Sequence, residues 1–396
     1  MVAATAERTR PHEPQLMRVG RRIPKRREGI LVVSRATIDH NAQRPEHVFL
    51  PEEITELKAG DKKTKSRSFF TRLRRKSEDA GITFEPTVGG NGLNMAHRLK
   101  EFGEKVTVYT WASKKYKNLL LADLDHPEWN LYQKIQDVDG DMPEALVYQV
   151  PKGEGLDRII IGTSPDMPSD FADAIDGSHE HVILNSLPEN SNPQLDWRAS
   201  LRRGIAKLID KAGGTETPYT YTPGSIQMDA VRNKDNATAV YEAIAHATNL
   251  MVNIDELKDL IEGYRKGITA ETDLTKLMEQ GLALGAKNIF VTMGEYGAAG
   301  ATLGDTPEES IIAWVEAMKP NNYVSNLGAG DAFAAGALRG NSLVERLKRG
   351  TASASFALEY AGAHENPPNE DELQKRIENK PVEHHIFAYK PRKIKL

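Results

Sequence analysis

The stretch NLGAGDAFAAG, residues 326–336, places three small residues directly before an acid and continues with residues that favour a helix. The first amides of a helix have no acceptor within the helix, and their dipoles favour an anion at that end. Gly328, Ala329 and Gly330 leave room for a phosphate, and Asp331 can accept the proton of an attacking hydroxyl. The stretch therefore predicts an anion site beside a catalytic base. A closely packed turn with Asp331 as the helix cap fits the same residues equally well.

The composition sets broad limits on the class of protein. The chain has 396 residues, of which 39% are hydrophobic, so it is long enough for one large globular domain or two ordinary ones. It has no run of about 18 apolar residues, and its first 28 residues lack the apolar part of a secretory signal, so we expect a cytoplasmic protein without membrane spans. The absence of cysteine excludes disulfides and thiolate chemistry. His179 and His181 lack a third ligand nearby in sequence and are predicted to be surface side chains.

Positive charge is concentrated near the N-terminus. Residues 1–80 hold 19 Lys and Arg against 11 Asp and Glu, whereas the formal net charge of the whole chain is −4. The basic runs 21–27 and 62–76 could contact nucleic acid or an anionic surface, but such runs are usually solvated, so no nucleic-acid partner is predicted. We expect residues 1–28 to be a poorly ordered basic extension and residues 51–82 to be an irregular, charged insertion.

Apolar strand-like runs alternate with helical runs over most of the chain, starting with HVILNSL at 181–187. This alternation predicts a mostly parallel sheet covered by helices on both faces. Near the start, residues 29–41 read as a strand whose end carries Asp39, and residues 84–112 read as a βαβ unit. The runs EALVYQVP and LDRIIIG, separated by KGEG, predict a hairpin within residues 144–162. We therefore expect one three-layer α/β/α domain with a small β lid.

The opening stretch resembles the C-terminal signature of the PfkB (ribokinase-like) carbohydrate kinases, Asp-Thr-x-Gly-Ala-Gly-Asp-x-Phe. The resemblance implies a ribokinase-like fold over residues 29–390, with a lid from parts of 40–85 and 105–165. It also implies that Asp331 is the base and that the preceding Gly-Ala-Gly amides form the anion hole. The leading Asp of the signature, near which a monovalent cation sits in some members, is Ser325 here, so potassium activation is not predicted.

A second stretch, GGNGLNMAHRLKEFG at 89–103, is similar to the family's N-terminal motif, Gly-Gly-x-x-x-Asn-x-Ala. Gly89 and Gly90 allow the backbone to approach a polyol, and the Asn94 amide can both donate to and accept from hydroxyls. The family's first strand commonly ends with an Asp that binds sugar hydroxyls, and the resemblance gives this role to Asp39. A turn or cap residue is the alternative for Asp39.

Two further motifs concern the nucleotide. Asn253 and Glu256 match the family's Asn-x-x-Glu motif, which implies that Glu256 holds Mg²⁺ through water and that Asn253 lies near the phosphates. The same spacing fits a capping box, and both roles can hold together. The stretch that follows resembles the family's Thr-x-Gly-x-x-Gly, which implies that Thr292, Gly294 and Gly297 border the nucleotide.

With YTPGS at 221–225, which resembles the family's Asn-Pro-Gly-Ser segment, five motifs occur in the family's order. They predict a kinase that transfers the γ-phosphoryl group of ATP to a hydroxyl of a sugar or sugar phosphate with Mg²⁺, although ADP-dependent relatives share these features. A nucleoside kinase of the same superfamily is one alternative. A catalytically silent sugar-binding or nucleic-acid-binding protein is another, and the retained Asp331 argues against it. Because lid edges often pair between subunits in this family, the resemblance also suggests a homodimer through the lid.

Overall fold

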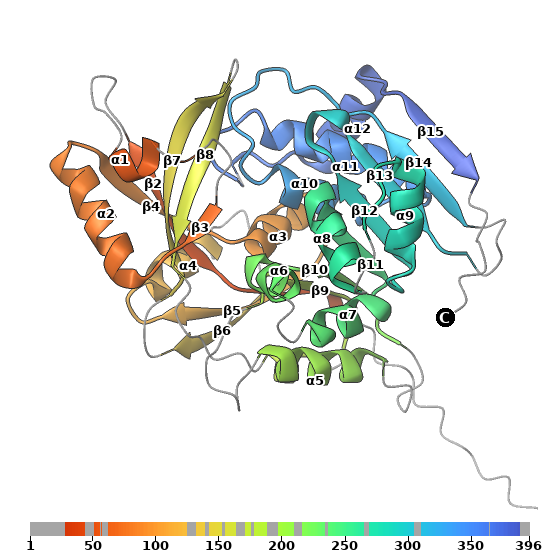
Figure 1. Cartoon of the computed structure of the whole chain (residues 1–396), viewed down its shortest axis with the longest axis horizontal. Coiled ribbons are helices and arrows are strands. Elements are labelled where there is room, and N and C mark those ends of the chain that lie inside the picture. The colour runs from red at the N-terminus through yellow and green to blue at the C-terminus, as the bar shows by residue number, and fades with distance from the viewer. Residues whose placement is uncertain are drawn as a thin grey trace, which may run out of the picture.

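The computed structural model describes residues 28–388 apart from 44–50, 56, 58–61, 125–131, 139–141, 153–154, 164–170, 176–177, 188–196, 210–215, 234–236, 265–268, 305–309 and 364. The predicted N-terminal extension therefore lies outside the described residues, except for Glu28, which begins the first strand. The described strands form two sheets, a large one and a smaller one beside it (Figure 1).

The large sheet has the strand order β15-β14-β13-β12-β11-β10-β9-β1-β5-β6. The strands from β6 to β12 pair in parallel, and β13, β14 and β15 pair antiparallel at the other edge. The prediction of a mostly parallel sheet is confirmed. The strand bounds are β1 Glu28–Ser34, β5 Val106–Ser113, β6 Tyr132–Val138, β9 His179–Asn185, β10 Tyr219–Thr222, β11 Asn249–Asn253, β12 Asn288–Thr292, β13 Ala298–Thr302, β14 Ile311–Val315 and β15 His384–Ala388.

Helices cover both faces of this sheet because successive strand residues point to opposite sides. Leu31 and Val33 of β1 belong to one buried cluster and Val32 belongs to the other. The predicted three-layer α/β/α fold is confirmed. The first cluster includes residues of α5 Trp197–Ile209, α6 Ser225–Arg232, α7 Thr238–Ala245, α8 Ile254–Tyr264 and α9 Leu274–Leu282, and the second includes residues of α3 Asn91–Glu101, α4 Lys117–Leu124, α10 Ala329–Ala337, α11 Leu343–Ala357 and α12 Glu370–Asn379.

The smaller sheet has the order β3-β8-β7-β2-β4 and forms the lid. Its β7–β8 hairpin is antiparallel, as predicted. One face packs against two helices, with Phe70 and Leu73 against Leu146 and Tyr148. The bounds are β2 Thr37–Gln43, β3 Lys62–Thr64, β4 Thr83–Gly89, β7 Glu144–Lys152, β8 Gly155–Gly162, α1 Glu52–Thr55 and α2 Arg67–Asp79.

Two predictions about the first strands are wrong. The run 29–41 is not one strand, because β1 ends at Ser34 in the large sheet and β2 begins at Thr37 in the lid, which places Asp39 in the middle of a lid strand. The segment 84–112 is not a βαβ unit either, because β4 pairs antiparallel with β2 in the lid while β5 lies in the large sheet. The chain changes direction at Gly90, whose φ of 116° favours glycine.

The prediction of an irregular insertion at 51–82 is also wrong, because the segment contains α1, β3 and the 13-residue helix α2. Ser66 caps this helix, since its Oγ accepts the Phe69 amide at 3.3 Å. Phe70, Leu73 and Ser77 form its buried stripe, and charged residues occupy the exposed side. Among the described residues of the predicted lid segment 105–165, β7 and β8 join the lid sheet, whereas β5 and β6 belong to the large sheet.

The histidines at the start of β9 are not surface side chains. His179 is 1% exposed, and His181 Nε2 lies 2.8 Å from the Thr220 hydroxyl. In the part of the chain that the structure describes, no group of three or more His, Cys, Asp or Glu residues could hold a metal ion. No helix within those residues is long and apolar enough to cross a membrane.

Candidate active site

The order of the strands determines where a ligand site is expected. From β1 the chain continues to β5 and β6 on one side, and the later strands from β9 to β12 lie on the other side. Ligands of open α/β sheets bind at the carboxyl ends of the strands where the order reverses. At this point the Asn91 side chain, on the first residue of α3, donates to the Ser186 hydroxyl at 3.2 Å just after β9. Ser186 has a φ of 44°, which is uncommon for a residue with a side chain.

The N-terminus of α10 has the small-residue turn that the sequence predicts. Gly328 is the N-cap with a φ of 73°, and a Cβ there would lie 2.7 Å from the Ala363 carbonyl oxygen, so glycine is required twice over. A Cβ on Gly330 would meet no atom within 4 Å, so space is open beside this amide. The Ala329 amide donates to the Asn326 carbonyl at 3.3 Å and thus belongs to the turn itself. The turn therefore leaves its open side at Gly330.

The two predicted signature motifs meet at this turn. The Asn94 side-chain amide donates to Asp331 Oδ2 at 2.8 Å across 237 positions of sequence. Asn94 is only 5% exposed, so this bond is largely shielded from water and fixes the orientation of the carboxylate. Asp331 itself is partly exposed and lies in the first turn of α10.

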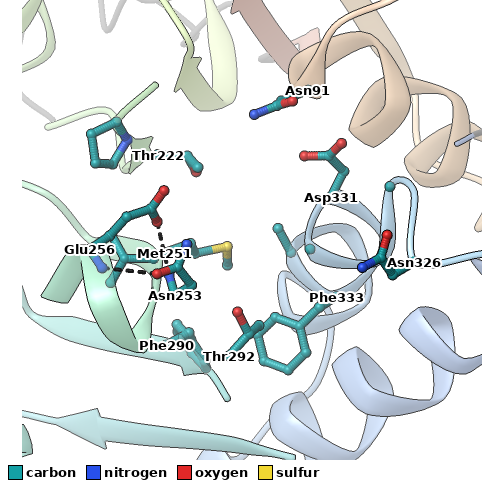
Figure 2. A pocket seen from close by; sticks show the side chains of 15 residues that line it. Asn91, Thr222, Met251, Asn253, Glu256, Phe290, Thr292, Asn326, Asp331 and Phe333 are labelled. Carbon is teal, nitrogen blue, oxygen red and sulfur yellow. Dashed lines mark hydrogen bonds between the residues drawn. The ribbon is translucent and has the colours of Figure 1, made fainter. Parts of the chain in front are cut away.

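A cavity of about 210 Å³ lies between this turn and the carboxyl ends of β10, β11 and β12 (Figure 2). Figure 2 shows Asp331 and Asn91 on one side of it and Glu256 with Thr222 on the other. The apolar side chains Met251, Phe290 and Phe333 also line the cavity, and its polar lining consists of Asn91, Thr222, Asn253, Glu256, Thr292, Asn326 and Asp331. Such a mixture of apolar walls and a few converging polar groups is typical of a small-molecule site.

Asn253 and Glu256 bond to each other's backbone at the start of α8. The Asn253 amide donates to Glu256 Oε2 at 2.9 Å, and the Glu256 amide donates to Asn253 Oδ1 at 2.9 Å (dashed lines in Figure 2). The capping box is therefore present. Both side chains also line the cavity, so the cap holds two oxygen-bearing groups at its wall.

The residues of the predicted Thr-x-Gly-x-x-Gly stretch differ in whether they line the cavity. Thr292 ends β12 and lines the cavity. Gly294 and Gly297 lie in the following turn and are not among the lining residues. Gly297 is buried with a φ of 90°, and a Cβ there would clash with the Val315 carbonyl. Packing against β14 therefore explains Gly297 without a ligand.

Of the predicted acceptor residues, Asp39, Gly89 and Gly90 lie in the lid strands or directly after them, and none of these three lines the cavity. Asp39 on β2 faces Gly89 on β4, and a Cβ on Gly89 would clash with Asp39 Oδ2, so glycine makes room for the carboxylate. Asp39 lies on the opposite face of the lid strand from its neighbour His40. His40 points the other way and contacts Glu144 at 2.8 Å.

Two residues near the site were missed by the sequence reasoning. Asn91 follows the Gly-Gly pair at the start of α3, a position that could have suggested a ligand contact. Arg98 lies one helical turn after Asn94 and is completely buried. Burial lowers the pKa of its guanidinium to about 10, and the nearby charge of Asp331 opposes this decrease.

Comparison with known proteins relates part of the chain to one family. Residues 224–370, which contain the cavity residues of β11, β12 and α10, match the family model described as pfkB family carbohydrate kinase. The matched segment, which is less than half of the chain, is similar to the PfkB kinases. The resemblance noted in its signature motifs is thereby confirmed.

The chain is 24% identical over 300 residues to an ATP-dependent 6-phosphofructokinase of Thermoanaerobacterium thermosaccharolyticum, covering 74% of this chain and 85% of that protein. Similar solved structures include a probable sugar kinase from Rhizobium etli, with 16% identity, a TM-score of 0.64 and coverage of 89% and 98% of the two chains. An adenosine kinase from Sinorhizobium meliloti has 18% identity, a TM-score of 0.64 and coverage of 89% and 99%. These two structures show that the fold is shared. These matches support a carbohydrate kinase, which is a phosphotransferase with an alcohol acceptor, and ATP is the donor that the matched family implies.

Proposed function

We propose that this protein transfers the γ-phosphoryl group of ATP to a hydroxyl of a sugar or sugar phosphate, with Asp331 as the general base. The observation that carries this proposal is the carboxylate of Asp331, held by Asn94 at 2.8 Å in the wall of the cavity and at the N-terminus of α10. A base and an anion-binding helix end adjoin one another there, as phosphoryl transfer to a hydroxyl requires.

In the proposed reaction, Asp331 accepts the proton of the acceptor hydroxyl as its oxygen forms a bond to the γ-phosphorus. The bond from the γ-phosphorus to the bridging oxygen breaks at the same time, and ADP leaves. The open Gly330 amide and the positive end of α10 stabilise the charge on the transferring group. Gly328 and Ala329 support this arrangement by shaping the turn.

Magnesium fits the side chains on the far wall. Asn253 and Glu256 offer oxygen atoms, which Mg²⁺ prefers, and the described residues hold no group of three or more acidic or His side chains that could bind it alone. We therefore assign Glu256 to hold it through water, with most of its ligands supplied by the nucleotide phosphates. When bound, the ion neutralises phosphate charge. Asn253 and Thr292 then border the nucleotide, whereas Gly294 and Gly297 of the predicted set lie outside the cavity lining.

The face of the lid strands that carries Asp39 suits an acceptor rich in hydroxyls. Asn41 donates to the Thr87 hydroxyl at 2.8 Å, and Thr87 donates to the Asp39 carbonyl at 3.3 Å, so the strands β2 and β4 are tied together by polar side chains. We propose that Asp39 binds acceptor hydroxyls, that Gly89 and Gly90 let the acceptor approach the backbone, and that Asn94 contacts the reacting hydroxyl beside Asp331.

A nucleoside kinase is the second candidate, because the adenosine kinase of Sinorhizobium meliloti has the same TM-score as the probable sugar kinase. A catalytically silent binding protein is less consistent with the site, because Asp331 and Asn94 are assembled. The proposed homodimer through the lid would have to use its edges or the face of Asp39, since α2 covers the other face.

A coupled assay of ADP release tests the proposal. Sugars, sugar phosphates and nucleosides are compared as acceptors with MgATP, and MgADP is tested as donor by AMP release. We expect turnover with a sugar or sugar phosphate and none with the Asp331→Asn variant. Turnover with nucleosides alone would favour the second candidate, and a lack of turnover with every acceptor and either donor would contradict the proposal.

A further inference from the structure

Arg98 is a buried cation in the layer of helices beneath the site. Its side chain is 0% exposed on α3, and its NH2 group donates to the Ala363 carbonyl at 3.0 Å. Its Nε and NH1 groups are buried and have no hydrogen-bond partner among the described residues. In the same part of the chain, no carboxylate forms an ion pair with it.

Such an arrangement is costly for folding. Burying a charge without an ion pair costs several kcal/mol, and an apolar side chain of similar length would fill the same space at lower cost. Although burial lowers the pKa of Arg98 to about 10, the group remains charged at neutral pH. A charge retained at this cost points to a role beyond packing.

The position of Arg98 connects it to both parts of the proposed base site. It follows Asn94 by four residues, so both side chains lie on the same face of α3. Asn94 holds Asp331, and Arg98 holds Ala363. Ala363 in turn abuts the N-cap Gly328, where a Cβ would lie 2.7 Å from its carbonyl oxygen. One helix face therefore anchors the base and the residue against which its turn rests.

We propose that Arg98 is a positioning residue for phosphoryl transfer, which fixes the Gly328 turn through Ala363 and places a permanent positive charge behind Asp331. This inference rests on the proposed function of Asp331. The charge favours the ionised carboxylate, so Asp331 remains a competent base at lower pH. It also adds to the positive potential at the start of α10.

Three variants separate the charge from the hydrogen bond. Arg98→Met removes both, Arg98→Gln removes the charge but keeps an N–H donor, and Arg98→Lys keeps the charge. Arg349→Met is the matched control, because Arg349 is also buried, on α11, but is paired with Glu370 at 2.6 Å away from the site. The readouts are kcat against pH, the KM for ATP and the midpoint of thermal unfolding.

We expect Arg98→Met and Arg98→Gln to lower kcat about 10- to 100-fold, as for a small misplacement of a catalytic group. We also expect the acidic limb of their pH profiles to move to higher pH. Arg98→Lys should keep kcat and the acidic limb of the pH profile close to those of the wild type. Arg349→Met should lower only the midpoint of thermal unfolding. If Arg98→Met does not fold, Arg98→Gln and Arg98→Lys carry the same comparison.

An unchanged kcat and acidic limb in Arg98→Gln would overturn the inference, and so would equal effects of the Arg98 and Arg349 variants. Asp331→Asn, measured in parallel, distinguishes a failure of the proposed base from a failure of the proposed role of Arg98. If it retains turnover, the proposed base is wrong. If it is inactive while the Arg98 variants are normal, only the role of Arg98 is refuted.

Discussion

Asp331→Asn is the most direct test of the site, because it changes the chemistry and little else. An amide has nearly the size of a carboxylate, its oxygen can still accept the Asn94 N–H, and the Gly328 turn is unaffected. The substitution removes the ability to take up the hydroxyl proton. General-base assistance typically contributes about 10²- to 10⁴-fold in rate. At about 1.4 kcal/mol for each factor of ten, the activation barrier should rise by about 3 to 5 kcal/mol.

The assay measures kcat with the best acceptor and ATP affinity by calorimetry on the same preparations. ATP affinity should persist, because the substitution leaves the open Gly330 amide and the Asn253–Glu256 wall in place. Asp255→Asn is a suitable control, because it removes an acidic side chain from the first turn of α8 rather than α10. It should cost at most about 1 kcal/mol of stability through the helix dipole and leave kcat unchanged. Turnover of Asp331→Asn within threefold of the wild type would refute the base and leave the residue as a helix cap.

Asp39→Ala should raise the acceptor KM at least about tenfold without changing ATP affinity, because a charged hydrogen bond contributes about 1.5–3 kcal/mol; equal weakening of both ligands would contradict its assignment. Glu256→Gln keeps an acceptor for the Asn253 amide but removes the charge, so half-maximal rate should require several-fold more Mg²⁺. If the Mg²⁺ titrations of the variant and the wild type superimpose, Glu256 serves only to cap the helix α8. Burial lowers the pKa of His181 to about 4 from 6.5, with a smaller effect of Arg346, so below pH 6.5 the unfolded chain binds a proton that the folded chain excludes. The wild type should therefore lose about 2 kcal/mol of unfolding free energy between pH 7 and 5 that His181→Gln does not lose, and equal pH slopes in denaturant titrations would exclude this origin.

The large sheet could be predicted because its signals are local. Each parallel strand, buried on both faces, appears as a short apolar run, and each covering helix appears as an amphipathic run. The GAGD turn could also be predicted from the sequence. A left-handed N-cap such as Gly328 needs glycine, and the open space beside Gly330 needs a small residue.

The lid was harder to predict because its strands are determined by contacts between residues that are far apart in the sequence. Ile38 continues the apolar run of β1 in sequence, although the chain has already crossed to another sheet. Its amide donates to the Pro143 carbonyl at 2.9 Å, a partner about a hundred residues away that no local pattern reveals. In α2, arginines and lysines outnumber the apolar residues, so the narrow stripe of Phe70 and Leu73 was hidden by the charged face.

The site residues were named from separate motifs, but only the fold shows that α3 connects them. Gly89, two residues before this helix, lies beside the Asp39 carboxylate in the lid, Asn94 near the start of the helix holds Asp331, and Arg98 one turn later bonds Ala363 beside the Gly328 turn. The α3 helix has 11 residues and is about 16 Å long, so it spans the distance between these contacts. The proposed acceptor residue Asp39 and the proposed base Asp331 thus meet residues at or near the same end of one helix. Arginine is a residue type that is rarely buried, so a sequence pattern assigns Arg98 to the solvent, whereas the fold places it on the buried side of α3.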